Sequence, residues 1–135
     1  MSNPVHHIEL WTHDLAASEP VWHWLLTELG WQHRTVPGWD RGRTWHHSSG
    51  VYVVLEESSA VVGDRHDRLR PGLNHLALRA ADRTALDLMR AAAGAHGWSE
   101  LFGERYPHAG GADHRALYLE NNEGFEVELA ASLDR

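Results

Sequence analysis

Two segments of this 135-residue chain repeat one pattern, and the repeat constrains the fold more than any other feature. Residues 4–15, PVHHIELWTHDL, align with residues 72–83, GLNHLALRAADR, so that His7 falls on His75. Each segment alternates apolar and polar residues as a half-buried strand does. Self-similarity at this spacing predicts two copies of one supersecondary unit.

A helix signal follows each of these strands. In the first copy Asp14 or Ser18 can cap the helix, and Gly30 is placed to end it. In the second copy Asp82 is the cap and Gly97 the stop. Apolar residues recur at helical spacing between these limits, so both copies are expected to bury one helix face.

Three short strands fit downstream of each helix. They are predicted at 32–36, 43–47 and 51–56 in the first copy, and at 99–105, 115–120 and 125–130 in the second. The segments between them are rich in turn-forming residues. Each copy is therefore predicted to have the element order β-α-β-β-β. We expect a first module at 1–57, a charged linker at 58–71 and a second module at 72–135.

Composition excludes several kinds of chemistry. The chain has no cysteine, and all 12 of its basic residues are arginine, so thiolate and lysine chemistry are absent, while 12 histidines favour a site with nitrogen and oxygen ligands. Its net charge of −7 argues against nucleic acid as a partner. No signal peptide and no long apolar run are evident. We therefore expect a cytoplasmic protein with no membrane partner.

The strand motif with a central His, an Asp seven residues later and a helix beyond it, together with the ending NNEGFEVEL, resembles the vicinal oxygen chelate superfamily. That group includes glyoxalase I, bleomycin-resistance proteins, fosfomycin-modifying transferases and extradiol dioxygenases. The resemblance implies an α+β fold in which paired βαβββ modules form a curved mixed sheet around a cavity, usually within a homodimer. It does not choose among the activities that share the fold.

The resemblance also implies a metal site. His7 and His75 match the first-strand ligands of the two modules, and Glu128 matches the carboxylate of the last strand. Two imidazoles and a carboxylate suit Zn, Ni, Co, Mn or Fe(II). The fourth family position falls on Val54, which cannot ligate, and Glu56 lies two residues further along the same strand face. The alternatives are a four-ligand site that uses Glu56 and a three-ligand site without it.

Strand alternation places polar residues on the face away from the helices. Glu9 lies two residues from His7 on that face, and Glu9 or Glu56 is the candidate proton carrier. A salt bridge to an arginine is the alternative role for Glu9. His6 is adjacent to His7 and is expected to point to the opposite face.

Four residues are candidates for contact with a substrate: Trp11, Trp45, Arg79 and Tyr106. Trp11 could form a pocket wall, Trp45 could line the pocket rim, and Tyr106 could belong to a lid with the glycine-rich segment that follows it. Arg79 could meet an anionic group, or instead form an internal ion pair with Glu126. Ordinary packing is the alternative for each aromatic residue.

These observations favour a divalent-metal-dependent enzyme that acts on a small oxygen-chelating substrate, of isomerase, lyase, dioxygenase or transferase type. The alternative is a metal-free binding protein that sequesters an aromatic or cationic antibiotic between tryptophans and acidic groups. A third reading is a scaffold or regulatory protein with a vestigial site. The enzyme ranks first because His7, His75 and Glu128 are all present.

Overall fold

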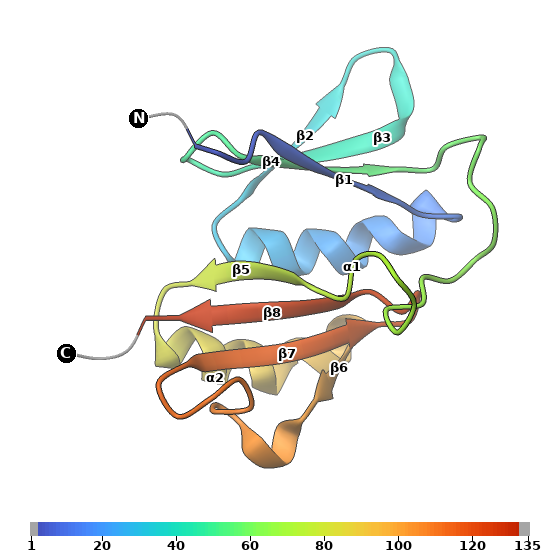
Figure 1. Ribbon diagram of the computed structural model, residues 1–135. Helices are drawn as coiled ribbons and strands as arrows, with labels where there is room; N and C mark the ends of the chain where they lie inside the picture. Colours follow the sequence, from blue (N-terminus) through green and yellow to red (C-terminus); the bar gives the residue numbers. More distant parts are fainter. Residues whose placement is uncertain (1–2, 133–135) are drawn as a thin grey trace. The chain divides into compact units, whose positions relative to one another are not determined.

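The computed structural model describes residues 3–132 of the chain, which divides into two compact units, Met1–Arg65 and His66–Arg135. Figure 1 traces both along the sequence. Each unit contains one four-stranded sheet and one α-helix of its own. Neither helix of the described part is long and apolar enough to cross a membrane.

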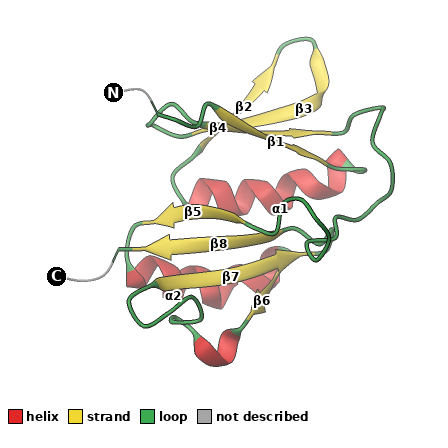
Figure 2. Cartoon of the chain, viewed as in Figure 1, coloured by secondary structure: helices red, strands yellow, loops and turns green. Residues whose placement is uncertain are grey.

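The first unit follows the predicted β-α-β-β-β order. Its elements are β1 (His7–Trp11), α1 (Leu15–Glu28), β2 (Gln32–Val36), β3 (Trp39–His46) and β4 (Tyr52–Glu56). The strands lie in the order β1-β4-β3-β2, with β1 parallel to β4 and the other pairs antiparallel. Helix α1 contacts β2, β3 and β4 and covers one face of this sheet (Figure 2).

The second unit repeats the arrangement. Its elements are β5 (Leu76–Ala80), α2 (Arg83–Ala92), the 3-10 turn η1 (Ala93–His96), β6 (Trp98–Leu101), the 3-10 turn η2 (Gly103–Arg105), β7 (Arg115–Asn121) and β8 (Glu126–Ala131). The strand order is β5-β8-β7-β6, with β5 parallel to β8. Helix α2 contacts β7 and β8. The α+β class and the order of elements are therefore confirmed.

The start of each helix matches a predicted cap, whereas α2 ends at Ala92, before the predicted stop at Gly97, and the chain reaches Gly97 through η1. Asp14, not Ser18, is the N-cap of α1, and its side chain accepts a hydrogen bond from the backbone of Ala17 at 3.1 Å. Asp82 caps α2 in the same way. The predicted strand at 99–105 is wrong beyond its first residues, because Phe102 adopts a left-handed conformation with φ 59° and the chain turns into η2.

Alternation along the strands separates a helix-covered face from an opposite face, which we call the far face. Leu10 and Leu78 are buried on the helix-covered side, as predicted. The largest fully buried side chains are Trp22, Trp45, Trp98, Leu25, Leu26, Leu55, Leu86, Leu117, Leu119, Leu129, Val53 and Val127. Each unit therefore has an apolar core between helix and sheet, and polar side chains are left for the far face.

Candidate functional site

Two of the predicted metal ligands lie side by side in the second unit. The parallel pairing of β5 with β8 puts Ala77 opposite Glu128, so His75, two residues earlier, lies on the same far face. The distance from His75 Nε2 to Glu128 Oε1 is 3.1 Å. The Glu128 side chain is 10% exposed and that of His75 is 35% exposed. The carboxylate is thus the recessed member of the pair.

Glu128 also receives hydrogen bonds from the β7 side. His114 Nε2 lies 2.5 Å from Glu128 Oε2, and Tyr118 is the residue paired with Glu128 across the strands. Burial, followed by the charge and hydrogen bond of Glu128, raises the pKa of Tyr118 to about 12, so the phenol stays protonated at neutral pH. His114 thus contacts Oε2, while Oε1 faces His75.

His114 was not among the residues predicted from the sequence, because it precedes the predicted strand and follows a glycine-rich turn. Strand parity carries the signal that could have found it: β7 begins at Arg115, and extending its alternation by one residue puts His114 on the side of Tyr118. Gly110 allows the close approach, since a Cβ there would lie 2.6 Å from both His114 Cδ2 and the Tyr118 hydroxyl.

The alternative role for Arg79, an ion pair with Glu126, is wrong. Arg68 takes that place: its Nε lies 2.8 Å from Glu120 Oε2, and its Nη1 lies 3.1 Å from Glu126 Oε1. Burial raises the pKa of Glu126, and the positive charge of Arg68 opposes this shift. Arg79 is exposed and makes no hydrogen bond or ion pair within residues 3–132. Its guanidinium group is accessible for an anion.

In the first unit His7 lies in a stack of rings. The Tyr52 ring is sandwiched between His7 and His46, with centroid distances of 4.9 Å on both sides. His6 was expected to point away from His7, but the Nδ1 atoms of the two rings are 2.8 Å apart. Burial, followed by the charge of Arg34, lowers the pKa of His46. The neighbouring rings restrict the plane of the His7 imidazole.

The two predicted catalytic carboxylates, Glu9 and Glu56, lie together on the far face of the first sheet. Glu9 is paired with Val54 and Trp11 with Glu56, so the acids are diagonal neighbours. Trp11 Nε1 donates to Glu9 Oε2 at 2.6 Å. Burial, followed by the hydrogen bond and negative charge of Glu9, raises the pKa of Glu56. A carboxyl pair of this kind can hold and release a proton.

Strand register shows which residue of the first sheet occupies the position equivalent to Glu128. The pairing of β1 with β4 and of β5 with β8 gives Val54 and Glu128 equivalent positions in the two sheets. Val54 is buried and offers no donor atom. Glu56 follows two residues later on the same face, whereas the Glu57 side chain turns to α1 and accepts a hydrogen bond from the backbone of Leu15 at 2.9 Å.

Two predicted substrate contacts are placed elsewhere. Trp45 is fully buried on the helix-covered side, and its Nε1 donates to His23 Nδ1 at 3.2 Å. The Tyr106 hydroxyl donates to Asp87 on α2 at 2.7 Å, and the Arg90 guanidinium lies 4.2 Å from the centre of the Tyr106 ring. Both residues therefore pack on the helix side of their units and not on the far face, where the predicted ligands lie. Trp11, in contrast, is 43% exposed on that face.

The His75–Glu128 pair fits a divalent metal ion by donor type and by spacing. Two donor atoms that each lie about 2.1 Å from one metal, at roughly 90–100° to each other, are about 3 Å apart, which is close to the observed 3.1 Å. No group of three His, Asp or Glu side chains within residues 3–132 is arranged to hold a metal ion. The second unit therefore offers a pair of donors, not a closed cage.

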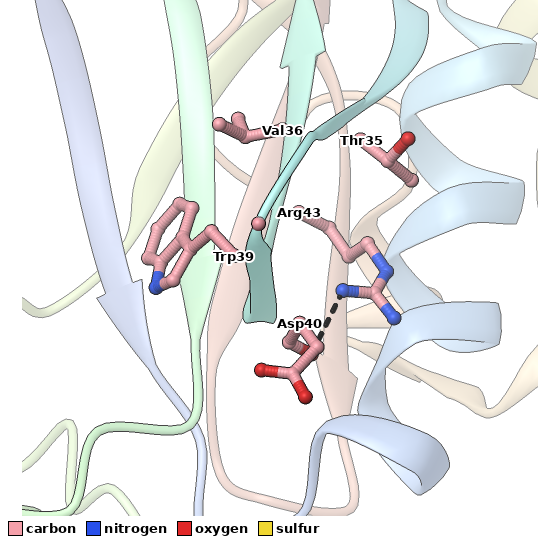
Figure 3. Close-up of a pocket in the computed structure, with 6 residues that line it drawn as sticks. Thr35, Val36, Trp39, Asp40 and Arg43 are labelled. Carbon is pink, nitrogen blue, oxygen red and sulfur yellow. Dashed lines mark hydrogen bonds between the residues drawn. The ribbon is translucent and has the colours of Figure 1, made fainter.

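Two shallow pockets lie away from these residues. One, of about 390 Å³, is lined by Thr35, Val36, Gly38, Trp39, Asp40 and Arg43. Figure 3 shows its side chains at the β2–β3 hairpin, with Arg43 Nη1 donating to the Asp40 carbonyl oxygen at 3.1 Å. The other, of about 410 Å³, is lined by Asp87, Arg90, Ala91 and Glu100. Neither pocket contains a predicted ligand or proton carrier.

The chain is similar in sequence to known proteins along most of its length. Residues 6–118 match the family model described as the Glyoxalase/Bleomycin resistance protein/Dioxygenase superfamily. Over 127 residues the chain is 35% identical to the protein YqjT of Bacillus subtilis (strain 168), a match that covers 94% of this chain and 98% of the relative.

Solved structures agree with the fold. A Bacillus halodurans crystal structure superposes with a TM-score of 0.83 at 33% identity, covering 96% of each chain. A glyoxalase/bleomycin resistance protein from Albidiferax ferrireducens gives a TM-score of 0.75 at 17% identity, covering 97% of this chain and 100% of the other. The fosfomycin resistance protein FosX of Listeria monocytogenes gives 0.67 at 16%, covering 98% and 94%. A FosX variant was crystallised with Mn(II) and a dihydroxypropylphosphonic acid.

Proposed function

This chain belongs to the Glyoxalase/Bleomycin resistance protein/Dioxygenase superfamily, and on that basis we propose that it is a divalent-metal-dependent enzyme acting on a small substrate with two chelating oxygens. The reaction would be of isomerase, lyase, dioxygenase or transferase type. The observation that carries the proposal is the 3.1 Å approach of His75 Nε2 to Glu128 Oε1. These atoms are donors of the kinds that Zn, Ni, Co, Mn and Fe(II) accept.

His7 is the third proposed ligand. Its described contacts engage Nδ1, through His6, and the ring face, through Tyr52. No hydrogen bond or ion pair within residues 3–132 engages His7 Nε2, so this nitrogen is the donor atom that the proposal assigns. Glu56 is the candidate for a fourth ligand. Because its raised pKa and its carboxyl neighbour suit proton transfer better, we assign it with Glu9 to that role.

A bound divalent ion would supply Lewis-acid polarisation of substrate oxygens. In this proposal the other residues bind the substrate and transfer protons. The Glu9–Glu56 pair would take a proton from the substrate or return it, because one of the two carboxyls can be protonated while the other is ionised. Trp11 offers an exposed aromatic surface to a planar group, and Arg79 offers a guanidinium for an anionic one.

Metal analysis of the purified and reconstituted protein tests this function. We expect about one equivalent of metal per chain in the wild type, and loss of more than about 100-fold in metal affinity for His75→Ala and Glu128→Ala, since even residues outside the ligand set cost 10–100-fold. His47→Ala and Glu104→Gln remove the same residue types elsewhere and should bind as the wild type does. Absence of stoichiometric metal in reconstituted wild type would refute the enzyme proposal.

A second candidate function rests on a different observation in the first unit. Trp11, Glu9 and Glu56 gather an exposed indole and two acids, and the Trp39 ring lies against Gly42, the strand partner of Glu56. Aromatic faces beside carboxyl groups suit a cationic aromatic ligand without any metal. Saturable quenching of tryptophan fluorescence by a cationic aromatic antibiotic, unchanged by a chelator, would favour this function over the enzyme.

Three further predictions accompany the enzyme proposal. We propose a homodimer, a cytoplasmic location and no nucleic-acid partner. The two modules at 1–57 and 72–135, with their linker at 58–71, stay a prediction alongside them. Sedimentation of the purified chain at several concentrations would measure the oligomeric state, and a monomer at every concentration would contradict the dimer.

A further inference from the structure

The residue directly before His7, and likewise the residue directly before His75, contacts the Nδ1 atom of that histidine. Asn74 Oδ1 lies 2.8 Å from His75 Nδ1, and His6 Nδ1 lies 2.8 Å from His7 Nδ1. The two contacts occupy equivalent positions of the repeat, but their chemistry differs. An amide oxygen can only accept a hydrogen bond, whereas a histidine nitrogen can donate or accept according to its tautomer.

The orientation of the Asn74 amide is determined by its second contact. Its Nδ2 donates to the backbone carbonyl of Arg68 at 3.1 Å, which leaves Oδ1 directed at His75. A flipped amide would put its oxygen against the Arg68 carbonyl oxygen, and the hydrogen bond to that carbonyl would be replaced by a repulsive contact. Arg68 is itself held by Glu120 and Glu126, so the carbonyl that orients Asn74 belongs to an anchored segment.

With Oδ1 as the acceptor, His75 must carry a proton on Nδ1. A neutral imidazole protonated at Nδ1 has its lone pair on Nε2, which is the nitrogen that faces Glu128 Oε1. We propose that Asn74 is a positioning residue for the metal site, one that fixes the tautomer and the ring plane of His75 so that Nε2 is the ligating atom. This inference rests on the proposed metal-dependent function.

Two substitutions separate this role from a merely structural one. Asn74→Leu removes both hydrogen bonds. Asn74→Asp keeps an acceptor for His75 but has no donor for the Arg68 carbonyl, so it retains only the contact that the proposal needs. Asn74→Ala serves if the leucine variant does not fold. Thermal unfolding of the metal-free proteins reports on folding itself.

The measurement is the affinity for Zn²⁺ alone, by competition with a chromophoric chelator, together with the nitrogen NMR signals of His75 in the zinc-loaded protein. We expect Asn74→Leu to lose 10–100-fold in affinity, the usual effect of removing a partner of a ligating histidine. Asn74→Asp should bind at least as tightly as the wild type. The NMR signals should show zinc on Nε2 and a proton on Nδ1 in the wild type and in Asn74→Asp.

The experiment distinguishes failure of the proposed function from failure of the role inferred for Asn74. If the wild type binds no zinc, the proposed function fails and this inference fails with it. If the wild type binds zinc and Asn74→Leu binds it equally well, the function stands and the inference is overturned. Equal losses in Asn74→Leu and Asn74→Asp would also overturn it, because they would trace the effect to the Arg68 contact. Zinc on Nδ1 in the wild type would do the same.

Discussion

The two units share one backbone pattern but place their carboxylates differently. At equivalent positions the first sheet has Val54 and the second has Glu128. The acid of the first unit, Glu56, comes two residues later and lies beside another acid, Glu9, whereas Glu128 lies beside two imidazoles. A repeated fold can therefore hold two kinds of carboxyl group, one suited to carrying a proton and one suited to binding a cation.

The strand histidines differ in the same way. His75 lies next to an acid and an amide, while His7 lies between rings, with Tyr52 stacked on it and His6 at its Nδ1. Metal-ligating histidines usually donate their second ring nitrogen to an oxygen acceptor, which His75 has and His7 lacks. The side chains of the second unit are thus arranged more favourably for binding a metal ion, and those of the first unit more favourably for acid–base chemistry.

The largest predicted effect is on stability, and it tests whether the helix-covered faces of the two sheets are buried to the same degree. Trp45 pairs with Val53, and Leu119 pairs with Val127, which are equivalent positions of the repeat. Trp45→Ala should lower the free energy of unfolding by about 3–5 kcal/mol and Leu119→Ala by about 2–5 kcal/mol, because each opens a cavity in a core. Trp11→Ala, at an exposed position, is the control. A Trp45→Ala protein as stable as that control would contradict the buried placement of Trp45.

The next effect concerns the paired charges of the second unit. Arg68→Gln should cost about 1–3 kcal/mol of unfolding free energy, since it leaves the buried Glu126 carboxylate without its cation, and the partial exposure of Arg68 keeps the cost below that of a fully buried pair. Arg79→Gln, on β5 and without a partner among residues 3–132, should change stability by less than about 0.5 kcal/mol. Equal effects in chemical denaturation would contradict the assignment of Arg68 as the partner of Glu126.

Much of this arrangement could be predicted from the sequence, because period-2 alternation and helix caps act locally. The repeat located both strand histidines, and parity placed Glu9 and Glu56 on one face. The rim position predicted for Trp45 is wrong, because its strand partner Val53 is a core residue and the indole lies on the same buried face. Tyr106 and His114 lie in a loop, where no period predicts which side chain a residue meets, so one was misplaced and the other missed.

A pH-dependent difference should separate the two kinds of carboxyl group. The pKa of Glu56 is raised in the folded protein, so the folded state binds more protons than the unfolded state just above the ordinary pKa, and stability falls as the pH rises through that range. Glu56→Gln removes this loss. Relative to wild type, it should gain stability as the pH rises above the ordinary pKa of glutamate, measured by urea unfolding. Glu104→Gln controls for the loss of one exposed charge, and a gain of the same size there would contradict the raised pKa of Glu56.

The smallest effect tests how the loop before β7 holds His114 against Glu128. A Cβ on Gly110 would lie 2.6 Å from both His114 Cδ2 and the Tyr118 hydroxyl, so in Gly110→Ala both groups must move relative to residue 110. Because both are ends of side chains, His114 on the loop and Tyr118 on β7, the cost should be about 1 kcal/mol or less. Gly94→Ala is the matched control, since its Cβ would meet nothing within 4 Å. In the NMR spectrum, the His114 ring signals should shift in Gly110→Ala alone. Unchanged His114 signals in that variant would mean that the loop does not position His114, and the second unit would then hold Glu128 through His75 and Tyr118.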